Sequence, residues 1–497
     1  MIRSRKMLFQ SCFLAAIVAA SFFCYVFNLD TYPAFYEDEP FFNTSAVRVL
    51  EGRSFSYEFA TDAPHSVSVW AYHAPFFFRT QVVTMKLFGI SHFSCRIPSF
   101  LCAHLAVLLL SLLLLRFGTF WGACFLSIGW FGDRALQEVL LGRPEGVCLF
   151  LITCGAALII RGALRRDWNS FAIAGVMMGA AVGFNPGGAY FGLASAASIV
   201  LVTPRTMWLR ALMDLMLGAL LSGLVALLFW LPDLIASYEQ FTWYVHLSTV
   251  GTRGDIWSTV HHMSQTLNGS RFWVLFLVLS SALWAIPSVV RDQVVGHSRM
   301  VDKPLLMLRG VAAMFSIAGV LMYVSSSRHP YYFSLLSVWP MVLMATFLNF
   351  GWRSWGRSLL IAAWCAVAVT CWVPSLFWNV MRCRESWIWR TSINKRSLVE
   401  TLQKTVPHGV EVMGDPSFFI AAHDAALRFT PLAFYATDTG INPPADAWLA
   451  LTPRYVEILK RSHYSVLDDR KLVADFACFP VNKYCSTRCL VYGPKQK

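Results

Sequence analysis

Apolar runs long enough to cross a lipid bilayer recur along the chain, and short segments rich in charge, proline or glycine separate them. A helix needs about 20 apolar residues to span the hydrocarbon core, so the pattern predicts roughly eleven membrane-spanning helices. They lie near residues 7–28, 94–115, 118–136, 144–161, 169–185, 188–203, 209–231, 272–289, 306–325, 330–348 and 358–377. At Asn185-Pro186-Gly187-Gly188 the pattern leaves two interpretations open, because a short polar break suits either a division between two helices or a kink within one.

The segment between the first two spans, residues 29–93, contains further helical patterns. Residues 40–52 mix apolar and polar positions at helical spacing, whereas residues 74–89 are apolar but short and interrupted. Both patterns predict helices that lie at the membrane interface.

The polarity of the chain becomes ordinary after residue 377. Helical patterns alternate there with strand-like runs, the helices at 395–405, 417–426 and 455–462 and the strands at 410–413 and 447–451. Such alternation predicts a small α/β domain. We therefore expect a mostly α, membrane-spanning core at residues 1–377 and a separate α/β domain at residues 378–497.

The composition agrees with a polytopic membrane protein. The 497 residues are 56% hydrophobic and 14% charged, whereas soluble domains carry about 25% charged residues. The formal net charge is +13, but Lys and Arg cluster in the short loops between apolar runs, and no basic helix with interleaved aromatic residues is present. This distribution argues against a nucleic-acid partner.

The positive charges also predict the orientation in the membrane. If the N-terminus is cytoplasmic, the cytoplasmic segments contain fifteen Lys and Arg against three Asp and Glu. The first external loop, in contrast, contains four Lys and Arg against seven Asp and Glu. Since cytoplasmic loops are enriched in Lys and Arg, we expect a cytoplasmic N-terminus, an uncleaved N-terminal anchor and an external tail. In an oxidising compartment the tail cysteines are candidates for at least one disulfide: Cys383, Cys478, Cys485 and Cys489.

An acidic pair, Asp38-Glu39, lies just beyond the first span, in the first external loop. Carboxylates at a bilayer surface are costly to desolvate, which makes the pair a candidate for a functional site. The neighbouring Glu37 leaves the register of the pair open by one position. The alternative interpretation is a solvated acidic patch, or charges that the helix dipole favours in the first turn of an interfacial helix.

The motifs around this pair carry a family resemblance through their order. The stretch Tyr36-Glu37-Asp38-Glu39-Pro40-Phe41-Phe42 is followed by Arg48, Gly52, Tyr72-His73-Ala74-Pro75-Phe76, and a run from Gly89 to Ser99 that contains Arg96 and Pro98. In this order they resemble the first external loop of GT-C glycosyltransferases, in particular the bacterial branch related to protein O-mannosyltransferases and lipid A aminoarabinose transferases. The resemblance covers most of residues 1–350 and implies a GT-C transmembrane core.

The resemblance implies an inverting transfer of a sugar from a polyprenyl-phosphate donor to a hydroxyl acceptor on the outer face of the membrane. Asp38 matches the family's catalytic acid and is implied to be the general base, with Glu39 orienting it or holding the acceptor. His73 occupies the family's basic position, although Ala74 replaces the family's first proline. A helix start with Pro75 in its first turn is the alternative there.

Two later motifs complete the implied site. Arg143-Pro144-Glu145 opens a span from the outer side, and Glu145 matches a second acidic residue of the family, although proline and an acid are also ordinary helix-starting residues. Ser327-Arg328-His329-Pro330-Tyr331-Tyr332 lies between two late spans, where relatives have a basic residue followed by Tyr. Arg328 is the implied clamp on the donor phosphate, because a guanidinium grips phosphate bidentately. Arg143 and His73 are further implied contacts of the phosphate, and Tyr331 and Tyr332 are implied contacts of the substrate. The alternative for Arg328 and the two tyrosines is that they anchor the protein at the level of the lipid headgroups.

Two other functions fit a polytopic membrane protein. A transporter or flippase of lipid-linked sugars predicts ionisable residues within the spans and repeated halves. A noncatalytic assembly protein with a GT-C-like core predicts loss of the acidic pair. The sequence has few ionisable residues within the spans and no repeated halves, and it retains the acidic pair.

We therefore expect a bacterial inner-membrane enzyme whose partners are a polyprenyl-phosphate sugar, a lipid, glycan or protein acceptor, and membrane lipids. The residues assign no metal ligand and no certain cofactor, and a divalent cation is left open. The identities of the sugar and the acceptor are left open as well.

Overall fold

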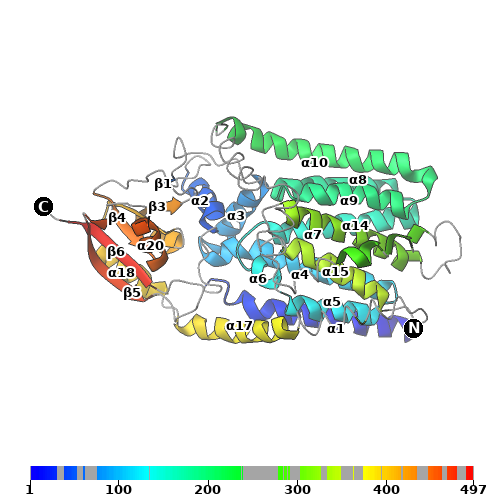
Figure 1. The fold of residues 1–497 in the computed structure, drawn as a ribbon, viewed down its shortest axis with the longest axis horizontal. Helices are drawn as coiled ribbons and strands as arrows, with labels where there is room; N and C mark the ends of the chain where they lie inside the picture. The colour runs from blue at the N-terminus through cyan, green and yellow to red at the C-terminus, as the bar shows by residue number, and fades with distance from the viewer. Residues whose placement is uncertain are drawn as a thin grey trace.

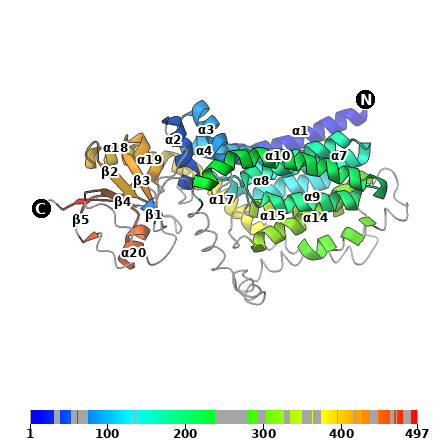
Figure 2. The same ribbon diagram turned by 90° about the horizontal axis from the view of Figure 1, so that it is seen from above.

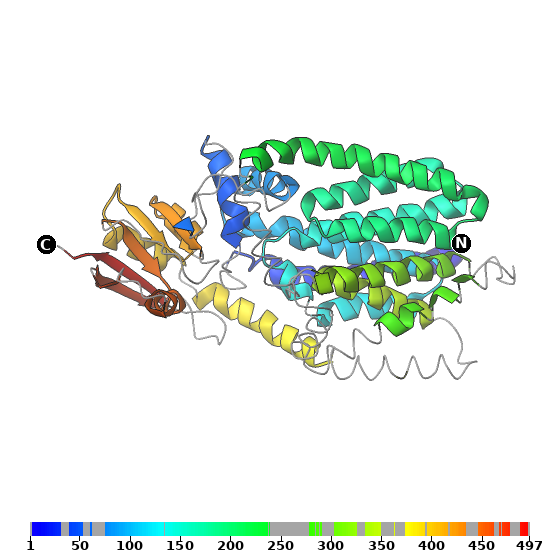
Figure 3. The same ribbon diagram turned by 45° about the horizontal axis from the view of Figure 1, so that its top comes forward.

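The structure is a computed structural model of the chain (Figures 1–3). It describes residues 2–30, 39–52, 60–61, 75–133, 135–236, 238, 278–283, 285–287, 289–290, 303–325, 333–348, 362, 373–392, 395–415, 418–433, 446–461, 467–468, 470–477 and 488–495.

A bundle of apolar helices forms most of the molecule and lies to one side of a smaller sheet (Figure 1). Its helices are α1 (Ile2–Val26), α4 (His92–Arg116), α5 (Phe120–Gly132), α6 (Ala135–Val139), α7 (Glu145–Arg165), α8 (Trp168–Phe184), α9 (Gly188–Val202), α10 (Trp208–Ala236), α14 (Lys303–Ser325) and α15 (Phe333–Phe347), with a 3₁₀ turn, η1 (Arg205–Met207), before α10. Five of the described helices are long and apolar enough to cross a bilayer: α1, α4, α7, α10 and α14. Several shorter apolar helices accompany them. The chain is thus a multi-pass membrane protein, and the predicted number of eleven spans stays a prediction.

Small residues let the bundle helices approach closely. A Cβ atom at Gly175 of α8 would collide with the carbonyl oxygen of Leu215 in α10, and one at Gly218 of α10 would collide with the carbonyl oxygen of Ala172. Small residues at a helix interface allow such backbone contact, which is the usual basis of helix packing in lipid. The α8–α10 pair is therefore set by glycines on both helices.

The polar break at residues 185–188 is a true division between two helices. Helix α8 ends at Phe184, and α9 begins at Gly188. The side chain of Asn185 stabilises the turn, because its Oδ1 accepts a hydrogen bond from the backbone N–H of Gly187 at 2.8 Å. The two-helix interpretation of this break is confirmed.

The predicted helix at 118–136 is wrong at its C-terminal end. Helix α5 ends at Gly132, where Asp133 adopts an extended backbone with ψ of 143°. Asp133 Oδ1 then accepts a hydrogen bond from the N–H of Ala135 at 2.7 Å, and the short helix α6 follows. A side chain that caps the next helix therefore ends this one, which hydropathy alone does not detect.

A six-stranded sheet forms the smaller part of the molecule, with the strand order β1-β3-β2-β4-β6-β5. Its strands are β1 (Ala60–Thr61), β2 (Glu411–Gly414), β3 (Arg428–Ala433), β4 (Trp448–Leu451), β5 (Arg470–Ala477) and β6 (Arg488–Pro494). The pairs β1–β3, β3–β2 and β2–β4 are parallel, while β6 pairs antiparallel with β4 and β5. Figure 2 shows α18 (Lys395–Thr405) and α19 (Phe419–Asp424) on one face of the sheet and α20 (Pro453–Arg461) on the other.

The sequence patterns of the tail agree with these elements. The predicted strands at 410–413 and 447–451 coincide with β2 and β4, and the predicted helices overlap α18, α19 and α20. The edge strand β1, however, comes from the first long loop and pairs with β3, so that Ala60 lies opposite Leu432. The sheet is thus completed by a strand that lies about 370 residues before its partner β3 in the chain, which local patterns do not predict.

Helix α17 (Val373–Ser392) leads from the bundle to the sheet and runs unbroken through residues 377 and 378, where the sequence predicts a boundary between two parts. Its buried Asn379 donates from Nδ2 to the carbonyl oxygens of Phe131 at 2.6 Å and Asp133 at 3.1 Å. Gln137 Nε2 in turn donates to Asn379 Oδ1 at 3.1 Å, and Tyr25 Oη donates to the Asn379 carbonyl oxygen at 2.8 Å. These bonds fix α17 against α1 and the α5–α6 junction.

Two helices lie between the bundle and the sheet, α2 (Glu39–Leu50) and α3 (Pro75–Phe88). Figure 3 shows α2, in dark blue, standing across the end of the bundle. The prediction of two helices in the first external loop is confirmed, and their position at a membrane interface stays a prediction. Glu51, directly after α2, lies 3.6 Å from His423 Nδ1 of α19, so this end of α2 contacts the sheet layer.

Candidate functional site

The start of α7 holds a buried ion pair at the end of the bundle that faces the sheet. Arg143 Nη2 donates to Glu145 Oε1 at 3.2 Å, and the two residues are only 6% and 2% exposed. Gly142 produces the turn before them, with a φ of +54° that residues with a Cβ rarely adopt. Glu145 is the first residue of α7, where the helix dipole also favours a negative charge.

Asn185 joins this pair from the turn between α8 and α9. Its Nδ2 donates to Glu145 Oε1 at 3.3 Å, while its Oδ1 holds the turn itself. Glu145 Oε1 therefore accepts two hydrogen bonds, whereas its Oε2 is buried and has no hydrogen-bond partner within the described part of the chain. A buried acceptor without a partner is unfavourable unless a further group binds there, so Oε2 is the open position of this cluster.

Gln81 connects the helices of the first external loop to the same cluster. Its side chain is fully buried, and its Nε2 lies 2.9 Å from Asn43 Oδ1 of α2, 3.3 Å from the carbonyl oxygen of Cys95 and 3.4 Å from that of Gly142. One amide group thus links α2, α3, α4 and the turn that precedes Arg143. The position of α2 is fixed relative to the ion pair as a result.

Helix α4 forms the base under these groups. Ser99 Oγ accepts a hydrogen bond from the backbone N–H of Gly146 at 3.0 Å, and a Cβ at Gly146 would collide with the carbonyl oxygen of Ser99. Arg96 is fully buried and donates from Nη1 to the carbonyl oxygen of Leu29 at 2.8 Å, which ties α4 to the end of α1. The motif from Gly89 to Ser99 therefore acts as a structural support of this end of the bundle.

The structure brings together two of the residues that the sequence proposes for the site, Arg143 and Glu145. The motif starts a helix and also forms a buried ion pair, and its role in the site stays a prediction. For Glu39 the structure describes only the backbone, as the first residue of α2. The remaining site residues predicted from the sequence lie outside the described residues: Asp38, His73, Arg328, Tyr331 and Tyr332.

The described neighbours of those residues nevertheless converge on the ion pair. Glu39 lies one helical turn, or about 6 Å along the axis, before Asn43, the partner of Gln81. Residues 326–332, which include Arg328, connect the end of α14 to the start of α15. Met322, in the last turn of α14, packs against Gly187, two residues after Asn185. Within the described residues, the first half of α2 and the last turn of α14 therefore lie close to the Arg143–Glu145 cluster.

Sequence reasoning missed Asn43, Gln81 and Asn185 as members of this cluster. Each has an amide side chain, and each is at least 95% buried. The usable signal is that a buried amide side chain almost always has a hydrogen-bond partner, so an amide next to an apolar run indicates a polar contact. Among the described residues, no three His, Cys, Asp or Glu side chains lie close enough to hold a metal ion, and a divalent cation is left without assigned ligands.

Comparison with known proteins adds a fold-level result. No protein-family model matches the chain, and no curated protein matches its sequence. Among solved structures, ArnT from Cupriavidus metallidurans bound to undecaprenyl phosphate is 15% identical, with a TM-score of 0.56 over 97% of this chain and 98% of that chain. The oligosaccharyltransferase of Archaeoglobus fulgidus in complex with Zn and sulfate is 12% identical, with a TM-score of 0.53 over 90% of this chain and 70% of that chain.

Both of these similar structures are GT-C glycosyltransferases, and the ArnT match extends over nearly the whole of both chains. The chain has a GT-C fold. The resemblance found in the sequence motifs is thereby confirmed at the level of the fold. Within this GT-C fold, the Arg143–Glu145 cluster lies at the sheet-facing end of the bundle, beneath the helices of the first external loop.

Proposed function

We propose that the chain is an integral-membrane glycosyltransferase that moves a sugar from a polyprenyl-phosphate donor to a hydroxyl acceptor. The observation that carries the proposal is the buried Arg143–Glu145–Asn185 cluster, which Gln81 links to Asn43 of α2. Ionisable groups buried in an apolar helix bundle are costly and therefore mark a candidate functional site. The fold shared with ArnT, a structure of which holds undecaprenyl phosphate, supports a donor of that class.

The proposed chemistry is a single displacement. Asp38 takes the proton of the acceptor hydroxyl as its oxygen attacks the anomeric carbon, and the bond from that carbon to the phosphate oxygen breaks with inversion. The leaving phosphate keeps the bonding electrons and needs no proton at neutral pH. Arg328 neutralises its charge, with Arg143 and His73 as further cationic groups.

Glu145 has a defined part in this proposal. Because it holds Arg143 Nη2 at 3.2 Å, it fixes the direction in which that guanidinium offers its remaining donors. Glu39 orients Asp38 or holds the acceptor, and Tyr331 and Tyr332 border the substrate next to Arg328. In this proposal the ion pair acts as a preorganised anion-binding group for the leaving phosphate.

The charge distribution over the bundle supports an external site. The starts of α1, α10 and α14 and the ends of α4 and α7 lie at the end of the bundle away from the sheet (Figure 1). Basic residues gather at these termini: Arg5, Lys6, Arg116, Arg161, Arg165, Arg205, Arg210 and Lys303. By the positive-inside rule that end is cytoplasmic, and the Arg143–Glu145 cluster and the sheet are periplasmic or extracellular. We propose a bacterial inner membrane as the location.

The test is a direct transfer assay with the purified full chain in detergent or nanodiscs. A series of polyprenyl-phosphate sugars is offered with candidate lipid, glycan and protein acceptors, and free polyprenyl phosphate and glycosylated acceptor are measured by mass spectrometry. Loss of the base slows such reactions by about 10²–10⁴-fold, so Asp38→Asn should lose turnover and retain donor binding, while Arg328→Ala should mainly weaken donor binding.

Glu58→Gln, which removes another acid of the same loop, is the matched control and should keep normal turnover. Near-normal turnover in folded Asp38→Asn would remove Asp38 from the mechanism. A wild-type protein that moves lipid-linked sugar across a vesicle membrane without cleaving the sugar–phosphate bond would instead support the flippase alternative.

A further inference from the structure

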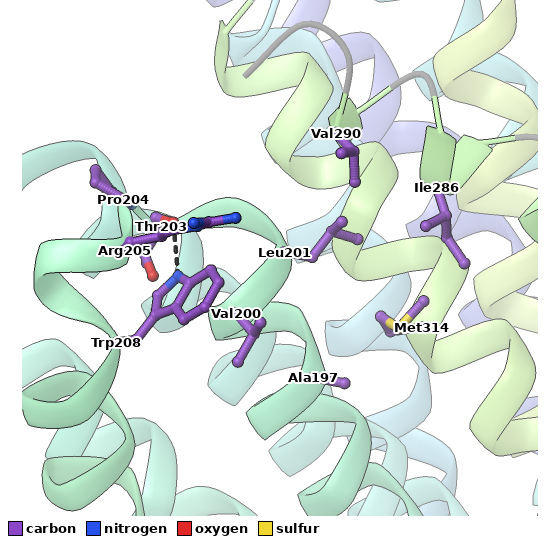
Figure 4. Close-up of a pocket in the computed structure, with 10 residues that line it drawn as sticks. All are labelled: Ala197, Val200, Leu201, Thr203, Pro204, Arg205, Trp208, Ile286, Val290 and Met314. Atoms are coloured by element: carbon purple, nitrogen blue, oxygen red, sulfur yellow. Dashed lines mark hydrogen bonds between the residues drawn. The ribbon is translucent and has the colours of Figure 1, made fainter. Parts of the chain in front are cut away.

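A groove of about 450 Å³ lies at the end of the bundle opposite the Arg143–Glu145 cluster. It is formed between the end of α9, the start of α10, the helical segment around residues 286–290, and α14 (Figure 4). Its volume falls within the range of about 300–1,000 Å³ that is typical of small-molecule sites. The proposed transfer reaction takes place at the other end and makes no use of this groove.

The walls of the groove are apolar and partly face outward. They consist of Ala197, Val200 and Leu201 of α9, Ile286 and Val290 of the segment across from it, and Met314 of α14. Ala197 and Val200 are exposed, and Val290 is 44% exposed. In a membrane-spanning bundle such exposed apolar side chains face lipid, so the groove is accessible from the hydrocarbon side.

The mouth of the groove carries a positive charge. Arg205 is exposed, and within the described part of the chain no carboxylate pairs with it. Its guanidinium lies 5.8 Å from the centre of the Trp208 ring, and Trp208 Nε1 donates to the carbonyl oxygen of Thr203 at 2.9 Å. Figure 4 shows Arg205 and Trp208 together at one end of the groove and the apolar side chains beyond them.

We propose that this groove binds one anionic phospholipid, with an acyl chain between α9 and α14 and the headgroup phosphate at Arg205. The combination of an apolar groove and an unpaired guanidinium at its mouth matches an amphiphile with a phosphate at one end. Trp208 lies beside Arg205, and tryptophans are enriched at the level of lipid headgroups. A soluble phosphate would leave the apolar part of the groove empty, which is why the occupant is a lipid.

Lipid binding to the purified full chain tests the proposal by native mass spectrometry. Phosphatidylglycerol, phosphatidylcholine and inorganic phosphate are the probes, and the number of bound molecules is counted at each concentration. The wild type should retain one phosphatidylglycerol with a preference of about fivefold over phosphatidylcholine, because one Arg near the headgroup contributes roughly that factor. Arg205→Gln should abolish the preference, and inorganic phosphate should not compete.

Arg210→Gln is the matched control for charge, because Arg210 lies five residues later, in the first turn of α10, but pairs with Asp214 at 3.9 Å and is not part of the groove. Ala197→Trp should fill the groove and prevent retention of the lipid. Leu193→Trp is its control, since Leu193 is 74% exposed one turn earlier on α9 and does not line the groove.

Equal retention of both lipids by the wild type, equal effects of the two Arg variants, or normal retention by Ala197→Trp would each overturn the proposal. All variants are first compared for monodispersity, so a misfolded variant is not scored. Bound lipid is counted without any transfer assay, so this result is independent of whether the proposed glycosyltransferase function holds.

Discussion

The buried pair Arg143–Glu145 permits a double-mutant cycle that separates stability from function. Replacing Arg143 by Leu removes the hydrogen bond to Glu145 Oε1 at 3.2 Å and leaves a carboxylate that is 2% exposed. The carboxylate then keeps the hydrogen bond from Asn185 Nδ2 to Oε1 at 3.3 Å. Its Oε2 has no hydrogen-bond partner among the described residues. Removing one partner of a buried ion pair costs about 3–5 kcal/mol, so Arg143→Leu should be strongly destabilised.

The second variant of the cycle, Glu145→Gln, keeps the shape of the side chain and an oxygen that can accept from Asn185, but it leaves the Arg143 guanidinium without its carboxylate. In the double variant Arg143→Leu/Glu145→Gln neither buried charge remains. The double variant should therefore be more stable than Arg143→Leu alone, with a coupling energy of about 1–3 kcal/mol between the two positions.

The assay is unfolding of the purified protein in detergent, followed by intrinsic fluorescence and by loss of monodispersity. If the two single effects simply add in the double variant, the ion pair is not coupled and this reasoning is refuted. The same samples test function, because the stable double variant should still lose sugar transfer if Arg143 and Glu145 belong to the site. A stable double variant with full transfer activity would remove both residues from the site and leave the ion pair as a structural feature.

Three further predictions follow from the packing and the charges. Gly175→Leu should prevent correct packing of α8 on α10, because a side chain there meets the backbone of α10. Gly192→Leu on α9 meets open space and should be tolerated, and the yield of monodisperse protein distinguishes the two variants. Asn379→Leu should destabilise the contact of α17 with the α5–α6 junction by about 1–3 kcal/mol, because it leaves the carbonyl oxygens of Phe131 and Asp133 without this donor. Proteolysis of the tail should become faster, and an unchanged proteolysis rate would show that these bonds do not hold α17 in place. In a cysteine-free background, Lys460→Cys should react with an impermeant maleimide in intact cells and Arg165→Cys only after permeabilisation, and the reverse result would contradict the proposed topology.

The predicted tail disulfide is still to be tested. Cys478 and Cys485 lie outside the described residues. Cys383 lies on α17, where its thiol donates to the carbonyl oxygen of Cys24 in α1 at 3.6 Å. Cys383 therefore contributes to the packing of α17 on α1, and alkylation of unreduced, denatured protein would show whether the other tail thiols are bridged.

The sequence by itself determined the features that depend on neighbouring residues. Apolar runs bounded by charge predicted most bundle helices, since hydrophobic length alone decides whether a segment suits the bilayer. The polar break at Asn185 and the patterns of α18, α19, β2 and β4 were equally readable, because turn chemistry and periodicity act over a few positions. The order of short motifs was enough to predict a GT-C fold.

The tertiary structure decided what joins distant parts of the chain. Glu145 meets Asn185 across 40 positions, and Asn43 meets Gln81 across 38, so neither contact has a signature in the local pattern. Likewise, β1 completes a sheet formed by the tail, and Asp133 ends α5 earlier than hydropathy predicts. Hydropathy indicates only whether a side chain is compatible with burial. Which polar groups satisfy one another after burial depends on helix packing, and that packing is fixed by close contacts at residues such as Gly146 and Gly175.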